Sequence, residues 1–216
     1  MLFKKLLTLT LILVIAITTT SAQEKDISGQ MLSSPIPNDP KVRIGQLQNG
    51  LTYYIRKNDK PEDKIEFRLV INAGSILENE DQQGLAHFVE HMAFNGSENF
   101  QKNELVNYLQ SIGVEFGADL NAYTSFDETV YMLPIPTGDP EVMDKGLKVL
   151  EDWAGGLQFT AEEIDKERGV VIEEWRLGQG ADQRMRDEWF PVMFKNSQYA
   201  NRLPIGKKEI IENADY

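Results

Sequence analysis

The sequence contains no cysteine among its 216 residues. Disulfide bonds, thiolate catalysis and cysteine-rich structural zinc sites are therefore excluded. Any zinc ion that the chain binds must take nitrogen and oxygen ligands. Histidine is almost as scarce, with two residues in the whole chain, so very few imidazole nitrogens are available to a metal or to acid–base catalysis.

Positive charge is also in short supply, because 22 lysines and arginines are outnumbered by 34 aspartates and glutamates and the formal net charge is −12. A nucleic-acid-binding protein needs a basic surface, so this balance argues against nucleic acid as a partner. The rest of the composition, with 41% hydrophobic and 26% charged residues, is ordinary for a folded globular chain of about one domain.

No hydrophobic run is long enough to span a membrane. The longest apolar segment, Leu6 to Ile17, has twelve residues and is interrupted by Thr8 and Thr10, whereas a spanning helix needs about 20. Lys4-Lys5 before this run and Thr20-Ser21-Ala22 after it are typical of a signal peptide. We therefore expect cleavage of residues 1–22 and export to the periplasm or the extracellular space, with no stable membrane anchor afterwards. Residues 23–40 contain three prolines and are expected to form an extended lead-in.

From residue 41 to residue 216 the chain alternates between strand and helix patterns, and we expect one domain there. Asn49-Gly50 is a hairpin signal. Asp139 before Pro140, and the capping box Thr160-Ala161-Glu162-Glu163, each predict the start of a helix. The order indicates an α+β fold, a mostly antiparallel sheet with helices packed against it. The expected strands are 42–47, 51–55, 65–73, 114–124 and 128–135; the expected helices are 82–94, 103–112, 140–153, 161–177, 183–194 and a short one at 210–211.

Both histidines fall in one pentapeptide, His87-Phe88-Val89-Glu90-His91. On a helix, residues four apart lie one above the other, so both imidazoles could hold one metal ion with Glu90 beside it. Asp81 is a candidate N-cap of this helix, and Gly96 is a candidate stop. The pattern is that of inverzincin zinc sites. The alternative is that these are ordinary histidines of an apolar helix.

A catalytic zinc ion needs a third protein ligand, and the helix expected at 161–177 offers glutamates at 167, 173 and 174. Glu167 and Glu174 are seven residues apart and therefore share one face, together with the apolar Val171. A carboxylate from such a helix would complete a His₂Glu ligand set, which is a known catalytic zinc arrangement. The alternative is that Glu167, Glu173 and Glu174 are simply solvated.

Several separated motifs resemble those of the pitrilysin/insulinase family of zinc metallopeptidases, and they occur in the family's order. The likeness covers nearly all of residues 38–216 and is greatest to secreted bacterial members. The resemblance implies the fold of that family's metallopeptidase domain. The matching segments are Gly74-Ser75, Gly84-Leu85-Ala86, the pentapeptide at 87–91, Asn121-Ala122-Tyr123-Thr124 and Glu167-Arg168-Gly169-Val170-Val171-Ile172-Glu173-Glu174.

The resemblance implies a role for each residue that matches the family's active site. His87 and His91 match the imidazole ligands of one zinc ion per domain. Glu174 matches the carboxylate ligand, because in the family that ligand follows a supporting glutamate of the catalytic site, here Glu167, by seven residues. Glu90 matches the general base that activates water for hydrolysis.

The resemblance also implies a substrate and a partner. The strand that carries Asn121 and Ala122 matches the one that pairs with the backbone of an extended or unfolded peptide, so a zinc metalloendopeptidase is expected. Family members usually comprise two homologous halves. This chain is therefore expected to be the N-terminal catalytic part, incomplete at its C-terminal end and completed by a second half in cis or by a partner subunit. As an isolated fragment it is expected to be poorly active.

Two other functions are compatible with such a fold. The chain could be a structural or assembly subunit without activity, as some relatives of the family are, or an exported module that only binds zinc. Missing ligands would favour the first alternative, and all three are present. Glu90 argues against the second, because a structural zinc site normally closes with a fourth protein ligand.

Overall fold

The structure is a computed structural model that describes residues 37–102, 104–114 and 121–215. The predicted signal peptide and most of the predicted lead-in lie outside these ranges. The chain divides into two compact units, residues 1–59 and 60–216, so the domain expected at 41–216 includes parts of both. In the part of the chain that is described, no helix has the length and apolar character needed to cross a membrane.

The first unit contains a β-hairpin. Strands β1 (Val42–Gln46) and β2 (Thr52–Arg56) pair antiparallel, with Val42 opposite Arg56. The turn between them is the predicted one. Gly50 has a φ of 92°, and the Asn49 side chain accepts a hydrogen bond from the Leu51 N–H. The Asn-Gly signal is confirmed because glycine supplies the positive φ that this turn requires.

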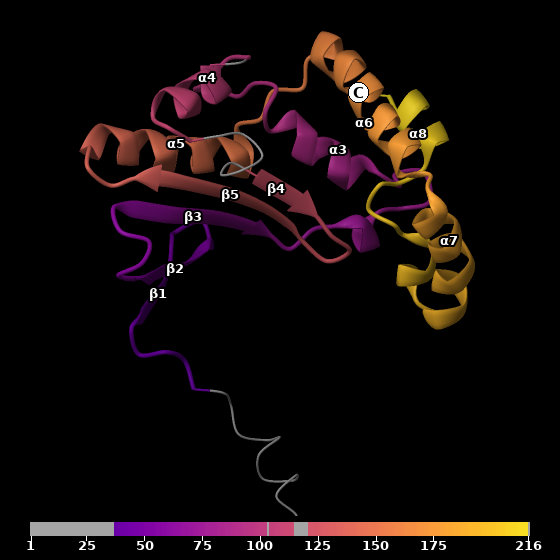
Figure 1. Ribbon diagram of the computed structural model, residues 1–216, viewed down its shortest axis with the longest axis horizontal. Helices are drawn as coiled ribbons and strands as arrows, with labels where there is room; N and C mark the ends of the chain where they lie inside the picture. Colours follow the sequence, from indigo (N-terminus) through magenta and orange to yellow (C-terminus); the bar gives the residue numbers. More distant parts are fainter. Residues whose placement is uncertain (1–36, 103, 115–120, 216) are drawn as a thin grey trace, which may run out of the picture. The chain divides into compact units, whose positions relative to one another are not determined.

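The second unit is built on a three-stranded antiparallel sheet (Figure 1). Its strands are β3 (Lys64–Ile71), β4 (Asn121–Thr124) and β5 (Thr129–Pro136), in the order β3-β5-β4. The central strand β5 is almost wholly buried, as expected for a strand with neighbours on both edges. β4 is short and occupies an edge. Only the last four residues of the strand expected at 114–124 form β4, and residues 115–120 lie outside the described part.

Two helices, α4 (Glu104–Ser111) and α5 (Pro140–Gly155), lie on one side of this sheet (Figure 1). Asp139 caps α5 as predicted, because its side chain accepts a hydrogen bond from the Glu141 N–H. Trp153 donates from its ring nitrogen to the Ala93 carbonyl at 3.1 Å. The buried core here comprises Ala93, Leu105, Leu109, Val114, Tyr131, Leu133, Ile135, Val149 and Trp153.

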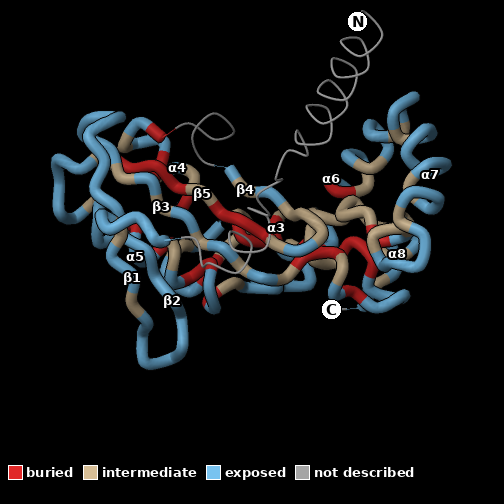
Figure 2. Tube along the Cα trace, turned by 90° about the horizontal axis from the view of Figure 1, so that it is seen from below, coloured by how far each residue is buried: buried red, intermediate tan, exposed pale blue. Residues whose placement is uncertain are grey.

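A second hydrophobic cluster joins three other helices: α3 (Leu85–Met92), α6 (Ala161–Gly178) and α8 (Lys208–Asn213). Thr160 caps α6 as predicted by accepting a hydrogen bond from the Glu163 N–H. Figure 2 shows buried positions running along β5 and α3. The cluster therefore fixes α6 against α3, and its buried members are Phe88, Met92, Ile164, Val171 and Ile211.

Helix α7 (Ala181–Met193) follows α6 and buries none of its own residues. Its Phe190 stacks on Phe126 of the β4–β5 turn, with ring centroids 6.0 Å apart. Two short 3-10 turns, η1 (Ser75–Leu77) and η2 (Gln198–Asn201), complete the unit. The predicted α+β fold class is confirmed, with a mostly antiparallel sheet and helices packed against it.

Candidate metal centre

The helix that carries the histidines does not begin where the sequence suggests. Asp81 is not its N-cap. Helix α3 begins at Leu85, and its N-cap is Gly84, which has a φ of 103° and no side chain to offer. The carboxylate of Glu78 takes this role instead, accepting hydrogen bonds from the Gly84 N–H at 3.0 Å and the Ala86 N–H at 2.8 Å. A buried carboxylate therefore satisfies the free donors of the first turn.

The segment before α8 encloses the same helix start. Arg202 is 4% exposed and donates from Nε to the Glu78 carbonyl at 3.1 Å. A Cβ placed on Gly206 would lie 2.3 Å from the Gly84 Cα atom. The two glycines therefore permit a backbone approach that no larger residue allows. The first turn of α3, which contains His87, is held by residues before and after it in the sequence.

The predicted ligands converge on one point. The Nε2 atoms of His87 and His91 lie 3.3 Å apart. The Glu174 Oε2 atom lies 3.3 Å from the His91 Nε2 atom and 3.7 Å from the His87 Nε2 atom. Nitrogen and oxygen ligands at zinc-bond lengths around a tetrahedral ion are separated by about 3.3 Å. This group of three residues therefore has the chemistry and the spacing of a zinc ligand set.

The neighbouring glutamate, Glu173, is excluded from this group by its contacts. Its carboxylate accepts a hydrogen bond from the Arg176 Nε atom at 2.8 Å, and the residue is exposed. Glu174 is 52% exposed at its side chain, whereas His87 is 12% and His91 20% exposed. The two imidazoles are thus enclosed, and the carboxylate reaches them from the solvent side.

Glu167 holds one imidazole in orientation. Its Oε1 atom lies 2.8 Å from the His91 Nδ1 atom, which turns the Nε2 atom toward His87 and Glu174. Its Oε2 atom accepts a hydrogen bond from the Asn95 side-chain amide at 2.5 Å. Carboxylates in this position orient metal-ligating histidines. Sequence reasoning missed Asn95, and its spacing of four residues from His91 is the one signal that could have pointed to it.

Charges around the ligands favour a cation. Burial opposes a positive charge on His91, but hydrogen bonds to Glu167 and Glu174 outweigh it and raise the pKa of His91 to about 9. The pKa of Glu174 is lowered, chiefly by its hydrogen bond to His91. The pKa of His87 is lowered by burial and by the nearby His91 ring, so its imidazole is neutral and able to bind a metal. The carboxylates that stabilise a proton here also stabilise a divalent ion.

Glu90 lies next to this group and is 8% exposed. Its Oε2 atom accepts a hydrogen bond from the Thr124 hydroxyl of β4 at 2.6 Å. Burial raises the pKa of Glu90, and the hydrogen bond from Thr124 opposes that change. A carboxylate whose pKa is raised above its ordinary value is better suited to accept and return a proton.

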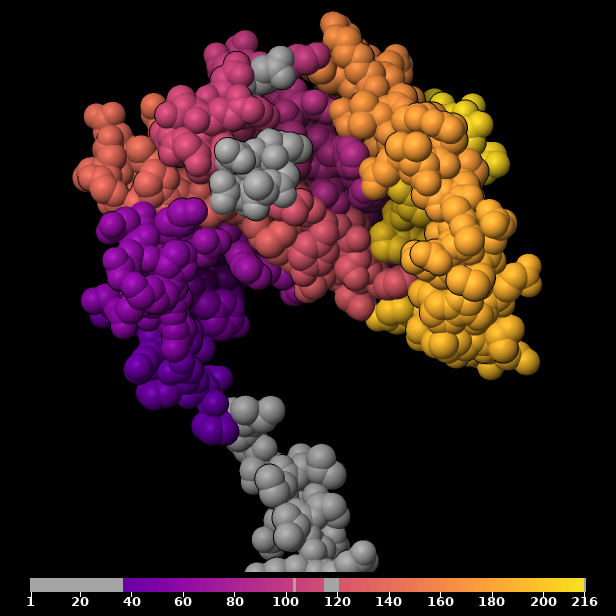
Figure 3. Space-filling model, in the orientation of Figure 1, coloured from indigo at the N-terminus to yellow at the C-terminus, as the bar shows by residue number. Residues whose placement is uncertain are grey.

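A cleft of about 790 Å³ opens beside the ligands. The edge strand β4 forms one side and the end of α6 with α7 another, and Figure 3 shows the surfaces of these elements. Ala122 and Thr124 line the cleft. Asn121 lies next to Ala122 on β4 with an exposed side chain, whose oxygen accepts the Ala122 N–H. Within the described ranges, β4 pairs only with β5, so its other edge has no strand neighbour there.

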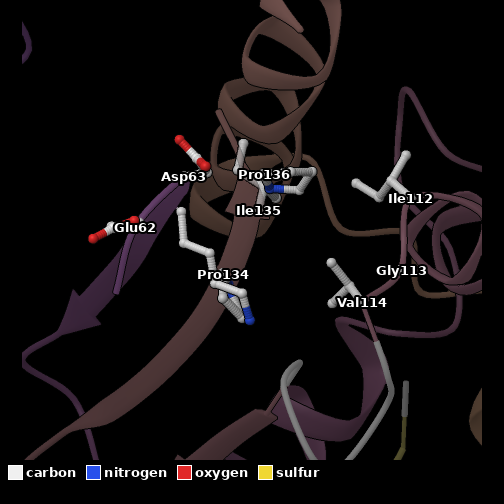
Figure 4. Close-up of a pocket in the computed structure, with 9 residues that line it drawn as sticks. Glu62, Asp63, Ile112, Gly113, Val114, Pro134, Ile135 and Pro136 are labelled. Atoms are coloured by element: carbon white, nitrogen blue, oxygen red, sulfur yellow. The ribbon is translucent and has the colours of Figure 1, made fainter. Parts of the chain in front are cut away.

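A smaller cavity of about 230 Å³ lies at the opposite end of β5 (Figure 4). Residues 62–64, 112–114 and 134–136 line it. It contains no histidine and shares no residue with the metal centre, so the two sites are separate.

Known protein families and curated proteins include sequences similar to this chain. A family model described as Insulinase (Peptidase family M16) matches residues 53–203. The chain is 40% identical over 177 residues to a probable zinc protease PqqL of Haemophilus influenzae, covering 82% of this chain and 19% of that protein. It is 37% identical over 185 residues to the probable zinc protease PqqL of Escherichia coli, covering 86% of this chain and 20% of that protein.

A solved structure is also similar. The first half of the periplasmic protease PqqL from Escherichia coli matches with a TM-score of 0.80 at 38% identity, covering 84% of this chain and 39% of that one. The chain therefore spans about a fifth of the length of the curated relatives it matches.

Proposed function

The chain belongs to the insulinase family, peptidase family M16, and from this membership and the geometry of the site we propose that it is the N-terminal zinc domain of an exported metalloendopeptidase. The proposed domain is residues 41–216, preceded by a signal peptide at 1–22 and a lead-in at 23–40. The observation that carries the proposal is the convergence of His87, His91 and Glu174 beside a buried Glu90.

The proposed roles follow from the contacts. His87, His91 and Glu174 would hold one zinc ion, and Glu167 keeps His91 in the tautomer and orientation that present its Nε2 atom. A zinc ion held there would polarise the scissile carbonyl and lower the pKa of a water molecule. Glu90 accepts the proton of the attacking water on its free carboxylate oxygen and then passes it to the leaving amine.

The proposed substrate is an extended or unfolded peptide. An incoming segment would add to the edge of β4 that has no strand neighbour among the described residues, where main-chain hydrogen bonds recognise the backbone rather than particular side chains. Asn121 and Ala122 lie on that edge, and Ala122 and Thr124 line the cleft that contains Glu90. The same short strand would thus align the peptide with the metal centre.

The rest of the enzyme is proposed to be supplied by other residues. The structural relative is described as the first half of a periplasmic protease, which supports a homologous second half in cis. A partner subunit is the alternative. The intact mass of the natural protein isolated from its own cell distinguishes the two: a mass several-fold above that of this chain indicates a second half in cis. A mass near that of this chain would require a partner.

Metal analysis and a peptide-cleavage assay of the natural protein test the function together. Glu90→Gln should keep one zinc ion per chain and abolish hydrolysis. Glu174→Ala should lose zinc, whereas the matched control Glu173→Ala should retain both zinc and activity. Equal zinc loss from the two variants would refute the ligand assignment. A zinc-loaded natural protein that cleaves no peptide would instead favour an assembly subunit.

A further inference from the structure

We propose that Thr124 is the positioning residue of the general base: its hydroxyl fixes the Glu90 carboxylate so that one oxygen faces the cleft. The inference rests on the proposed function, because it takes Glu90 as the base. It begins from the distance of 2.6 Å between the Thr124 Oγ1 atom and the Glu90 Oε2 atom. Among the described residues, Thr124 is the single hydrogen-bond partner found for the Glu90 carboxylate.

The surroundings fix the direction of this hydrogen bond. An ionised carboxylate can only accept, so the Thr124 hydroxyl must donate. The hydroxyl of Thr129 on the adjacent strand lies 3.4 Å from the Thr124 hydroxyl. Thr129 donates to the Ala73 carbonyl at 2.9 Å and is therefore not dependent on Thr124. The Thr124 proton is thus directed to Glu90.

Backbone geometry alone does not orient Glu90. Its carboxylate is separated from the α3 backbone by rotatable bonds, and rotation about the last of them is broad. The hydrogen bond from the Thr124 hydroxyl of β4 restricts that rotation and occupies the Glu90 Oε2 atom. The Oε1 atom is then the oxygen available to water in the cleft, which Thr124 and Glu90 both line. A base must lie within hydrogen-bond reach of the proton it removes, so restricting its carboxylate favours the reactive geometry.

Thr124 also links two parts of the proposed mechanism. It is the last residue of β4, the strand proposed to pair with the peptide, and it lies opposite Thr129 in the sheet. The element that aligns the scissile bond is therefore also the element that holds the base. If Thr124 served only to pack in the strand, any β-branched side chain would suffice, and valine would replace it without loss.

The test compares variants of the natural protein. Thr124→Val removes the hydroxyl at nearly constant shape and should lower kcat about 10- to 100-fold, within the range that a general base contributes. We expect KM to stay within about twofold. Zinc content and melting temperature should stay near those of the wild type. Thr124→Ser, which keeps the donor, should restore most of kcat. Ser125→Ala removes the next hydroxyl along the chain, which makes no bond to Glu90, and should leave kcat unchanged.

A double-mutant cycle separates this inference from the function on which it rests. In a Glu90→Gln background, Thr124→Val should cause little further loss of the residual rate, because it acts through Glu90. An active Glu90→Gln protein would overturn the assignment of the base, and with it this inference. If Glu90→Gln is inactive but Thr124→Val keeps kcat within twofold, or if Thr124→Ser is as impaired as Thr124→Val, the positioning role alone is overturned.

A crystal structure provides a readout that does not depend on turnover. In zinc-loaded Thr124→Val the Glu90 carboxylate should rotate or occupy more than one orientation, whereas in Thr124→Ser it should keep its place. An unchanged, fully ordered Glu90 in Thr124→Val would overturn the inference.

Discussion

Removal of the Glu78 carboxylate should destabilise the helix that carries both histidines. Glu78→Ala deletes the acceptor for the Gly84 and Ala86 N–H groups. Loss of a helix N-cap costs about 0.5–2 kcal/mol, and a buried donor left unpaired costs about 1–3 kcal/mol. Burial raises the pKa of Glu78, so removing this charge recovers part of its desolvation cost. We therefore expect a net loss of about 2–3 kcal/mol in the free energy of unfolding.

Urea unfolding measures this loss, and metal affinity measures its consequence for the site. His87 lies in the first turn of α3, so fraying of that turn should weaken zinc binding by about tenfold or more, equivalent to about 1.4 kcal/mol. Competition with a chromogenic chelator gives this affinity. Asp81→Ala is the matched control, because the sequence suggests Asp81 as the cap and the structure does not.

The control variant should remain within about 0.5 kcal/mol of the wild type. The reasoning fails if Asp81→Ala is as destabilising as Glu78→Ala, since the helix would then begin where the sequence pattern placed it. It also fails if Glu78→Ala unfolds at the wild-type urea concentration.

Two further predictions concern how the ligands are held. Asn95→Ala should weaken zinc binding about 10- to 100-fold, because the Glu167 carboxylate then loses one of its two hydrogen-bond partners. Chelator competition measures this affinity. An unchanged affinity would show that the Asn95 amide does not orient Glu167. Val171→Ala and Val149→Ala remove the same atoms from equally buried sites and should each cost about 1–3 kcal/mol in urea unfolding. Only Val171→Ala should also weaken zinc binding, because Val171 of α6 belongs to the buried cluster that packs α6 against α3. Equal affinities in both variants would contradict that link.

The elements that could be predicted from the sequence are those whose signals lie within a few residues of the structure they specify. Asn49-Gly50, Asp139 before Pro140, and Thr160 each form the turn or cap expected of them. The start of α3 could not be predicted in this way. Its cap comes from Glu78, six residues before Gly84, and it is supported by Arg202. A helix start that depends on a tertiary contact has no local signature.

The same distinction applies to the site. Helical periodicity places His87 beside His91 and Glu174 on the face of Glu167, and the family resemblance then identifies Glu174 as the carboxylate ligand. The roles of Asn95 and Thr124 depend on how α6 and β4 pack against α3, over separations of 72 and 34 residues. The spacing of four residues between His91 and Asn95 hints at a shared face, but it does not specify the contact with Glu167, and no local signal specifies the contact between Thr124 and Glu90. The substrate-binding roles of Asn121 and Ala122 remain predictions.

The distances within the site are set by packing rather than by the ligands themselves. Glu174 is half exposed, and its contacts to the two imidazoles are 3.3 and 3.7 Å. Its place is determined by α6, which is fixed to α3 through the buried Val171 and its neighbours. The carboxylate at 167 then joins α6 to His91 by a hydrogen bond. A zinc ion would add a second link between the two helices close to the first, so the same apolar interface that stabilises the fold preorganises the ligands, and metal binding should stabilise that interface in return.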